Sequence, residues 1–102
     1  MQKVIIDIET IQKYTNGLSY DEFINDGKTL DAVMFRLVQM IENIKNISQE
    51  YKEKTESIVQ WGKVIGFRNG IVHEYGATDY TIVYEVITRD IQTIKELFEK
   101  EL

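Results

Sequence analysis

The spacing of its apolar residues constrains this chain more than any other feature of the sequence. Through most of the 102 residues, apolar side chains return at steps of three and four, and proline is absent. Those steps place apolar residues on one face of an α-helix, whereas a half-buried strand would show strict alternation, which is nowhere sustained. The pattern therefore predicts an all-α fold.

Residues that stop and cap helices divide the chain into segments. An Asn-Gly pair at residues 16–17 ends a first helix, and Ser19 with Glu22 has the spacing of a capping box at the start of a short second helix. Thr29 is placed to cap a long third helix. Residues 48–57 are mostly polar and charged, and we expect them to form a loop or a frayed turn.

A fourth helix contains residues 61–76, WGKVIGFRNGIVHEYG, and Gly76 is expected to end it. Thr78 or Asp79 then caps a fifth helix. Four substantial amphipathic helices and a short one, joined by short loops, indicate an antiparallel bundle, and the length fits a single domain over residues 1–102. The stripes expected to form the core are Val4, Ile8, Ile11 and Tyr14 in the first helix, Leu30, Val33, Leu37, Met40 or Ile41, Ile44 and Ile47 in the third, and Val83, Val86 or Ile87, Ile91, Ile94 and Phe98 in the fifth.

The composition narrows the classes of function. Cysteine is absent, so neither a disulfide framework nor a thiolate metal site is possible. No apolar run approaches the roughly 20 residues of a membrane span, and acidic residues interrupt the apolar N-terminal segment, unlike a signal peptide. We therefore expect a cytoplasmic protein with no membrane partner. The net charge of −5 and the lack of a basic stripe mean that any binding of nucleic acid depends on a small local site.

Residues 61–76 have an unusual distribution of side chains for a helix. At about 100° per residue, Gly62, Gly66 and Gly70 fall together and leave one face almost bare. Glycine inside a helix costs roughly 0.5–1 kcal/mol relative to alanine, so three of them suggest the close approach of another group. A tight contact within the monomer, a second protomer and a polyanionic ligand each fit this pattern. The opposite, core-facing arc contains Trp61, Ile65, Arg68, Val72 and Tyr75.

The polar residues of this helix do not all point the same way. Arg68 lies among the core-facing residues, where a buried charge is costly unless it is paired. His73 is five residues further on, about 140° away on an ideal helix, whereas Asn69 shares the face of His73. Either the helix bends near its end, or two copies of the segment meet across a dimer axis. We expect a homodimer with the glycine edge near its two-fold axis.

The same segment brings a guanidinium, an amide, an imidazole and a phenol together between Arg68 and Tyr75. The sequence has no His-x-x-x-His pair for zinc and no motif of a serine nucleophile or a phosphate-binding glycine loop. The four groups suit cleavage of RNA, whose 2′-hydroxyl is a built-in nucleophile, because an imidazole moves protons and a guanidinium neutralises developing charge. Taken alone, His73 also fits an ordinary surface or core residue, and Tyr75 fits a core or interface residue.

The stretch RNGIVH has the form R-x4-H and resembles the R-x4-6-H motif of the HEPN superfamily, a group of helical domains rich in metal-independent ribonucleases. With Tyr75 it becomes R-x4-H-x-Y, and with the preceding WGKVIGF it resembles the HepT family. HepT proteins are the toxins of toxin–antitoxin pairs whose partner, MntA, is a minimal nucleotidyltransferase. The similarity extends over residues 17–44 and 78–94, and so over nearly the whole chain.

Two features depart from the family pattern. Residues 40–42 read Met-Ile-Glu where Ile-Gly-Glu is usual, which weakens the case for a role of Glu42. The usual proline near the last helix is missing, and Gln92 stands around that point. Neither departure touches the R-x4-H-x-Y core.

The resemblance implies a HEPN-like helical fold and a metal-independent endoribonuclease toxin that needs no cofactor. Arg68 and His73 would be its catalytic pair, with Asn69 as their polar companion. Tyr75 would be the residue that an MntA-like nucleotidyltransferase antitoxin adenylylates. The alternative is a non-catalytic helical partner of a nucleotidyltransferase, and the intact pair of Arg68 and His73 favours the ribonuclease.

Overall fold

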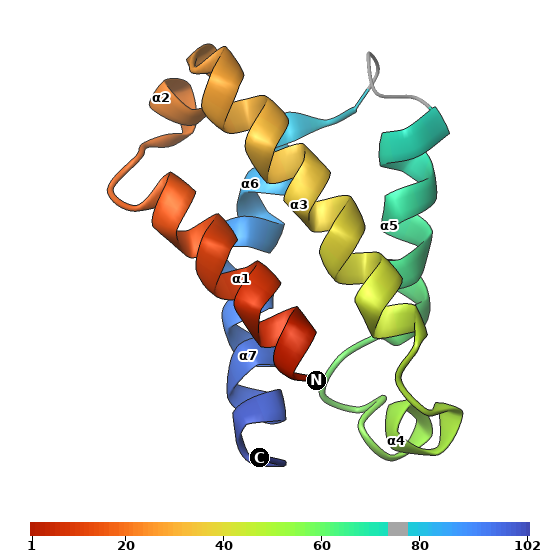
Figure 1. The fold of residues 1–102 in the computed structure, drawn as a ribbon. Helices are drawn as coiled ribbons and strands as arrows, with labels where there is room; N and C mark the ends of the chain where they lie inside the picture. The colour runs from red at the N-terminus through yellow and green to blue at the C-terminus, as the bar shows by residue number, and fades with distance from the viewer. Residues whose placement is uncertain (74–77) are drawn as a thin grey trace.

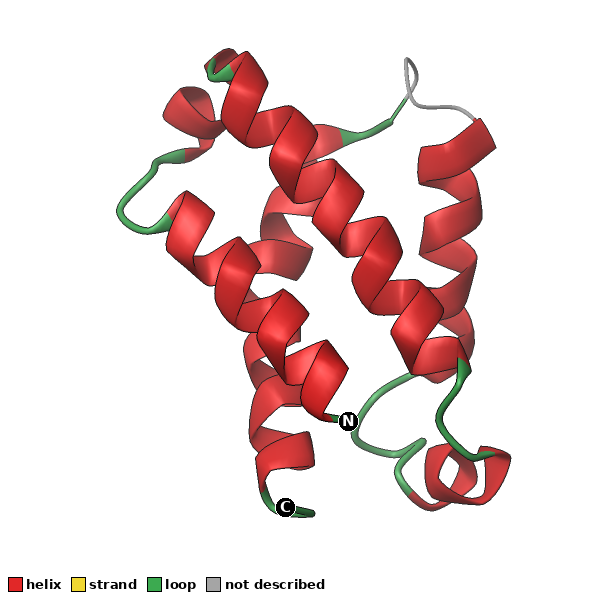
Figure 2. Ribbon diagram, viewed as in Figure 1, coloured by secondary structure: helices red, strands yellow, loops and turns green. Residues whose placement is uncertain are grey.

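The computed structural model describes residues 1–73 and 78–102, and every regular element within these ranges is a helix (Figures 1 and 2). The prediction of an all-α fold is confirmed. No helix in the described ranges has the length and apolar character needed to cross a membrane. The elements are α1 (Gln2–Thr15), α2 (Tyr20–Asn25), α3 (Gly27–Lys45), α4 (Gln49–Lys54), α5 (Trp61–His73), α6 (Tyr80–Glu85), the π-helix η2 (Val86–Asp90) and α7 (Ile91–Glu99).

Four long helical rods run in alternating directions, as predicted. Helices α1, α3 and α5 lie side by side, and α6, η2 and α7 form one continuous rod behind α1 and α3 (Figure 1). Helix α5 packs mainly against α3. The two helices are close where α3 ends and α5 begins, and they diverge toward the C-terminal end of α5 (Figure 1).

The core consists of apolar side chains from all four rods. The predicted stripes are correct in most positions, because helix periodicity and core packing agree there. Helix α1 lies between α3 and α7, so its buried face also takes in Ile5, whereas Tyr14 is 41% exposed and not a core residue. The buried apolar side chains are Val4, Ile5, Ile8, Ile11, Phe23, Val33, Met34, Leu37, Met40, Ile41, Ile44, Val59, Trp61, Ile71, Val83, Ile87, Ile91, Ile94 and Phe98.

The turn after α1 has the expected chemistry, with one correction. Gly17 has a φ of 78°, a conformation that favours glycine. The predicted capping box is present, because the backbone N–H of Glu22 donates to Ser19 Oγ (3.2 Å) and that of Ser19 donates to Glu22 Oε1 (3.0 Å). Helix α3, however, is capped by Asp26, whose Oδ1 accepts from the backbone N–H of Thr29 at 3.1 Å. Thr29 is the third residue of the helix and not its cap.

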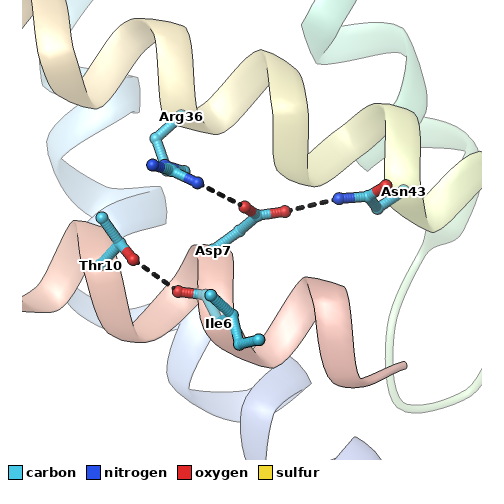
Figure 3. A network of polar contacts seen from close by, with 5 residues as sticks. All are labelled: Ile6, Asp7, Thr10, Arg36 and Asn43. Carbon is cyan, nitrogen blue, oxygen red and sulfur yellow. Dashed lines mark hydrogen bonds and ion pairs between the residues drawn. The ribbon is translucent and has the colours of Figure 1, made fainter.

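A buried carboxylate ties α1 to α3 (Figure 3). Asp7 is 3% exposed, and its two oxygens point to different side chains of α3. Arg36 Nη1 donates to Asp7 Oδ1 at 3.1 Å, and Asn43 Nδ2 donates to Asp7 Oδ2 at 2.8 Å. Arg36 and Asn43 are seven residues apart and so lie on one face of α3, which lets both reach Asp7.

Residues 48–57 include a short helix where a loop or frayed turn was expected. Ser48 caps α4, with its Oγ accepting from the backbone N–H of Tyr51 at 3.2 Å. Lys52 is only 8% exposed, and its Nζ donates to the carbonyl oxygen of Lys45 at 3.2 Å. The prediction was wrong because a charged segment still forms a helix when a cap starts it and lysine stems pack on apolar neighbours.

The last rod begins at Asp79, one of the two caps considered, whose Oδ1 accepts from the backbone N–H of Thr81 at 2.9 Å. Its buried residues Val83, Ile87 and Ile91 follow each other at four-residue steps. Such a step advances an α-helix by about 40° beyond one full turn. The wider π turn of η2 offsets part of that drift and keeps these side chains on the core face.

Candidate active site

Helix α5 carries the R-x4-H segment, and its first residue fixes it to the bundle. Trp61 is 2% exposed, and its ring stacks on Phe98 of α7 with centroids 5.8 Å apart and planes 10° apart. Its Nε1 donates to Thr55 Oγ1 at 2.9 Å, so the buried indole N–H has a partner. The tryptophan predicted to face the core does so, and it anchors the N-terminal end of α5.

Arg68 is paired with an acidic residue of the neighbouring helix. Its Nε lies 2.7 Å from Oε1 of Glu42 in α3, and the two side chains are 28% and 40% exposed. Both atoms are shielded from solvent and make no hydrogen bond among the described residues, so their ion pair is what balances the two charges. This is the partner that an arginine on the apolar arc requires.

Glu42 is therefore the site residue to which the sequence interpretation gave too little weight. The departure at residues 40–42 does not prevent its contact with Arg68. The signal that pointed to it was the arginine itself, because a guanidinium among core residues needs a carboxylate nearby. Lys45 also lies 3.8 Å from Glu42 Oε2, on the same helix.

Asn69 holds the guanidinium from a second side. Arg68 Nη1 donates to Asn69 Oδ1 at 3.3 Å. Because Glu42 contacts Nε and Asn69 contacts Nη1, the guanidinium is oriented at two of its nitrogens. A guanidinium has further N–H donors, so these contacts do not exhaust its capacity to bind an anion.

His73 is the last described residue of α5, and it is exposed. Helix α5 is continuous from Arg68 to His73, so the two residues are five positions apart on one helix, an ideal separation of about 140°. Of the two explanations for this separation, a meeting across a dimer axis remains as a prediction. Tyr75 and Gly76 lie outside the described residues.

The exposure of α5 corrects two expectations about its faces. Val72, placed on the core-facing arc, is 45% exposed, whereas its neighbour Ile71 is 3% exposed. Apart from the backbone of α5 itself, no described atom lies within 4 Å of the position that a Cβ would take at Gly62, Gly66 or Gly70. A tight contact with the described residues of the monomer is therefore not the reason for these glycines.

No group of three or more histidine, cysteine, aspartate or glutamate side chains in residues 1–73 and 78–102 is arranged to hold a metal ion. Among the described residues, the Glu42 carboxylate and the Asn69 amide hold the guanidinium of Arg68. The exposed imidazole of His73 follows five residues later on the same helix.

Comparison with known proteins places the chain in a family. The profile of the family described as "Ribonuclease HepT-like" matches residues 4–101. A relative named "Putative RNase", from Caldanaerobacter subterraneus subsp. tengcongensis, is 29% identical over 99% of this chain and 93% of its own length. A second, named "Probable ribonuclease HepT", from Thermococcus cleftensis, is 29% identical over 91% of this chain and 84% of its own. No solved structure matches the chain. The chain therefore belongs to the ribonuclease HepT-like family.

Proposed function

We propose that this protein is a metal-independent endoribonuclease that cleaves RNA with Arg68 and His73. The observation that carries the proposal is the preorganised guanidinium of Arg68, held by Glu42 and Asn69 on the helix that also exposes His73. Membership of the ribonuclease HepT-like family supports RNA as the substrate. So do the relatives named as RNases.

The reaction uses a nucleophile that RNA supplies. The 2′-hydroxyl oxygen attacks the adjacent phosphorus, the bond from phosphorus to the 5′ oxygen breaks, and a 2′,3′-cyclic phosphate and a 5′-hydroxyl result. His73 takes the proton from the 2′-hydroxyl or delivers one to the leaving 5′ oxygen, since an imidazole does either near neutral pH, and water accepts or supplies the other proton. Arg68 binds the non-bridging oxygens and stabilises the charge that develops on them.

Glu42 and Asn69 have positioning roles in this scheme. A guanidinium that is already oriented does not have to reorganise when charge develops on the phosphate. The ion pair with Glu42 also lowers the net positive charge at Arg68. Phosphate binding therefore depends more on how the N–H donors of the guanidinium are oriented than on the electrostatic field of the whole chain. That suits a chain with a net charge of −5.

The proposal includes a homodimer. Arg68 and His73 of one chain point about 140° apart, and a two-fold axis lets Arg68 of one copy and His73 of the other face the same phosphate. An isologous contact brings two copies of the segment into one cleft. Light scattering tests this directly, and a monomer at micromolar concentration would contradict it.

The proposed biological role is that of a toxin silenced by a nucleotidyltransferase antitoxin. Tyr75 follows His73 by two residues, so an adenylyl group attached there adds a negative phosphate close to the segment that binds RNA. That phosphate competes for Arg68 and repels the RNA backbone. Coexpression with a cognate nucleotidyltransferase should add adenylyl mass to the wild type and abolish toxicity, whereas Tyr75→Phe should remain toxic. Equal silencing of Tyr75→Phe without added mass would contradict this route.

Cleavage assays with purified protein test the ribonuclease proposal. Cleavage should persist in EDTA and fall by a factor of at least about 10² in Arg68→Ala and in His73→Ala, the low end for acid–base catalysis. Arg89→Ala is the matched control, because Arg89 is a 73% exposed arginine of η2, and it should cleave like the wild type. Circular dichroism must show that each variant folds. Loss of cleavage in EDTA that a divalent ion restores would overturn the mechanism, and an inactive wild type would favour the non-catalytic partner.

A further inference from the structure

Two cations share the carboxylate of Glu42. Its Oε1 lies 2.7 Å from Nε of Arg68, and its Oε2 lies 3.8 Å from Nζ of Lys45, three residues further along α3. An ordinary exposed pair, such as Glu50 with Lys54, sets one carboxylate against one cation. Around Glu42 two positive charges stand against one negative charge. The group of Arg68, Glu42 and Lys45 is therefore positive, in a chain whose net charge is −5.

The two cations differ in how firmly they are held. Both atoms of the contact between Arg68 and Glu42 are shielded from solvent. The contact of Lys45 is too long for a hydrogen bond, and the Lys45 side chain is 46% exposed. Within residues 1–73 and 78–102 its ammonium has no further ion-pair or hydrogen-bond partner. An ammonium has three donors, so Lys45 can bind another anion.

The backbone that carries Lys45 is fixed. Lys45 is the last residue of α3, at the end where α3 and α5 are close (Figure 1). Its carbonyl oxygen accepts from Nζ of Lys52 at 3.2 Å, and Lys52 is only 8% exposed. The last carbonyl groups of a helix have no partner within the helix, so a buried lysine that binds one of them orders the helix end. The side chain of Lys45 thus starts from a defined point beside Glu42.

A lysine at the end of a helix also has an ordinary explanation. A cation there offsets the partial negative charge of the helix C-terminus, and a glutamate three residues earlier adds a favourable pair. Both effects are small at an exposed position. Lys13 has the first role in the last turn of α1, whose C-terminal end lies away from α5 (Figure 1). What distinguishes Lys45 is the arginine on the other oxygen of the same carboxylate.

We propose that Lys45 binds a second phosphate of the RNA strand, next to the phosphate that Arg68 holds. The two cations contact different oxygens of Glu42, so the carboxylate separates them and they do not share one phosphate. RNA carries one phosphate per nucleotide, so the ligand of Lys45 is a phosphodiester adjacent to the scissile one. The inference rests on the proposed function and deepens it, because Lys45 supplies the positive charge that the neutral pair of Arg68 and Glu42 lacks.

The salt dependence of RNA binding tests this contact without cleavage. The probe is a short single strand with 2′-O-methyl groups throughout, which lacks the nucleophile, and fluorescence anisotropy measures its dissociation constant. Each phosphate contact with a single strand contributes about 0.7 to the slope of log affinity against log salt concentration. Lys45→Ala should therefore lower the slope by about 0.7 and weaken binding about fivefold at about 0.1 M salt, with no difference from the wild type near 1 M. Lys45→Arg should keep the wild-type slope.

Lys13→Ala is the matched control. It removes the same charge from the same position of another helix, so the two variants have equal net charge and lose the same interaction with a helix end. Lys13→Ala should bind the strand with the wild-type slope, and circular dichroism should show that both variants fold. An equal loss of slope in Lys13→Ala would assign the effect to net charge and overturn the proposal.

Kinetics separate a phosphate contact from a role through Glu42. Because the proposed contact lies away from the bond that breaks, Lys45→Ala should raise KM with little change in kcat. A lower kcat with an unchanged salt slope would mean that Lys45 only orients Glu42, and would overturn the proposal. So would a wild type that does not bind the strand. A wild type that binds with the expected slopes but cleaves no RNA would support the contact and overturn the ribonuclease. Cleavage by Lys45→Ala with unchanged KM and slope would do the reverse.

Discussion

Replacing Asp7 with alanine should destabilise the protein by about 3 kcal/mol. Asp7 is 3% exposed and accepts hydrogen bonds from Arg36 and Asn43. Each hydrogen bond to a charged group contributes roughly 1.5–3 kcal/mol. The lower end of the summed range applies, because the Arg36 side chain is 31% exposed and water screens its charge once the carboxylate is gone. With an unfolding entropy of roughly 2.1 cal/mol/K per residue, 3 kcal/mol lowers the midpoint of thermal unfolding by about 14 °C.

Urea and thermal unfolding monitored by circular dichroism measure this loss. Asp7→Asn keeps the shape and one acceptor oxygen but replaces the other with an NH2 group and removes the charge that Arg36 pairs with, so it should recover only part of the stability. Glu50→Ala is the control, because its ion pair with Lys54 is 4.0 Å long, with side chains 84% and 73% exposed. It should cost less than about 1 kcal/mol. A loss below about 1 kcal/mol in Asp7→Ala would refute the account of Asp7 as the polar link between α1 and α3.

Substitutions at three further positions test other parts of the structure. Trp61→Phe should keep the stack on Phe98 but lose the hydrogen bond to Thr55, and so lower the free energy of unfolding by about 1 kcal/mol. Urea unfolding measures this, and an unchanged free energy would mean that the hydrogen bond does not stabilise the fold. Hydrogen bonds from Ser19 lower the pKa of Glu22, so this cap stabilises the fold above the ordinary glutamate pKa and is lost as the pH falls through the lowered value. Ser19→Ala keeps the larger backbone hydrogen bond and removes the side-chain one, so in an NMR titration it should raise the Glu22 pKa only part of the way to its ordinary value; an unchanged value would refute the side-chain contribution. Glu42→Gln should lower RNA cleavage without unfolding the protein, with Glu42→Asp in between, and full activity of Glu42→Gln would rule out the positioning role.

Most of the fold follows from local pattern, and the exceptions are cases where a distant contact decides. The apolar steps of α1, α3 and the last rod predict their buried faces because the period of the side chains is the period of the helix. Helix α4 was missed because its lysines read as solvated, whereas Lys52 packs its stem and donates to Lys45. The sequence located the N-cap of α3 only to within one turn, because Asp26 and Thr29 are both good capping residues. The backbone conformation at the start of the helix makes Asp26 the cap.

The candidate site was predictable in its composition but not in its contacts. The resemblance of the R-x4-H segment to the HEPN motif makes Arg68 and His73 the candidates, and their spacing shows that they diverge on a helix. Sequence also indicates that Arg68 needs a carboxylate, but Glu42 is 26 positions away, and only the packing of α3 on α5 brings it within 2.7 Å. The exposure of Val72 likewise depends on how far α5 diverges from α3, which periodicity does not report.

The central claim is that Arg68 and His73 cleave RNA through its own 2′-hydroxyl, and one comparison of substrates tests it most directly. The purified protein is incubated in EDTA with an RNA that it cleaves and with the same sequence carrying 2′-O-methyl groups throughout. The account predicts cleavage of the RNA alone, with 2′,3′-cyclic phosphate ends and with loss of the reaction in His73→Ala. Cleavage of the 2′-O-methylated strand, or products that lack the cyclic phosphate from the outset, would contradict it.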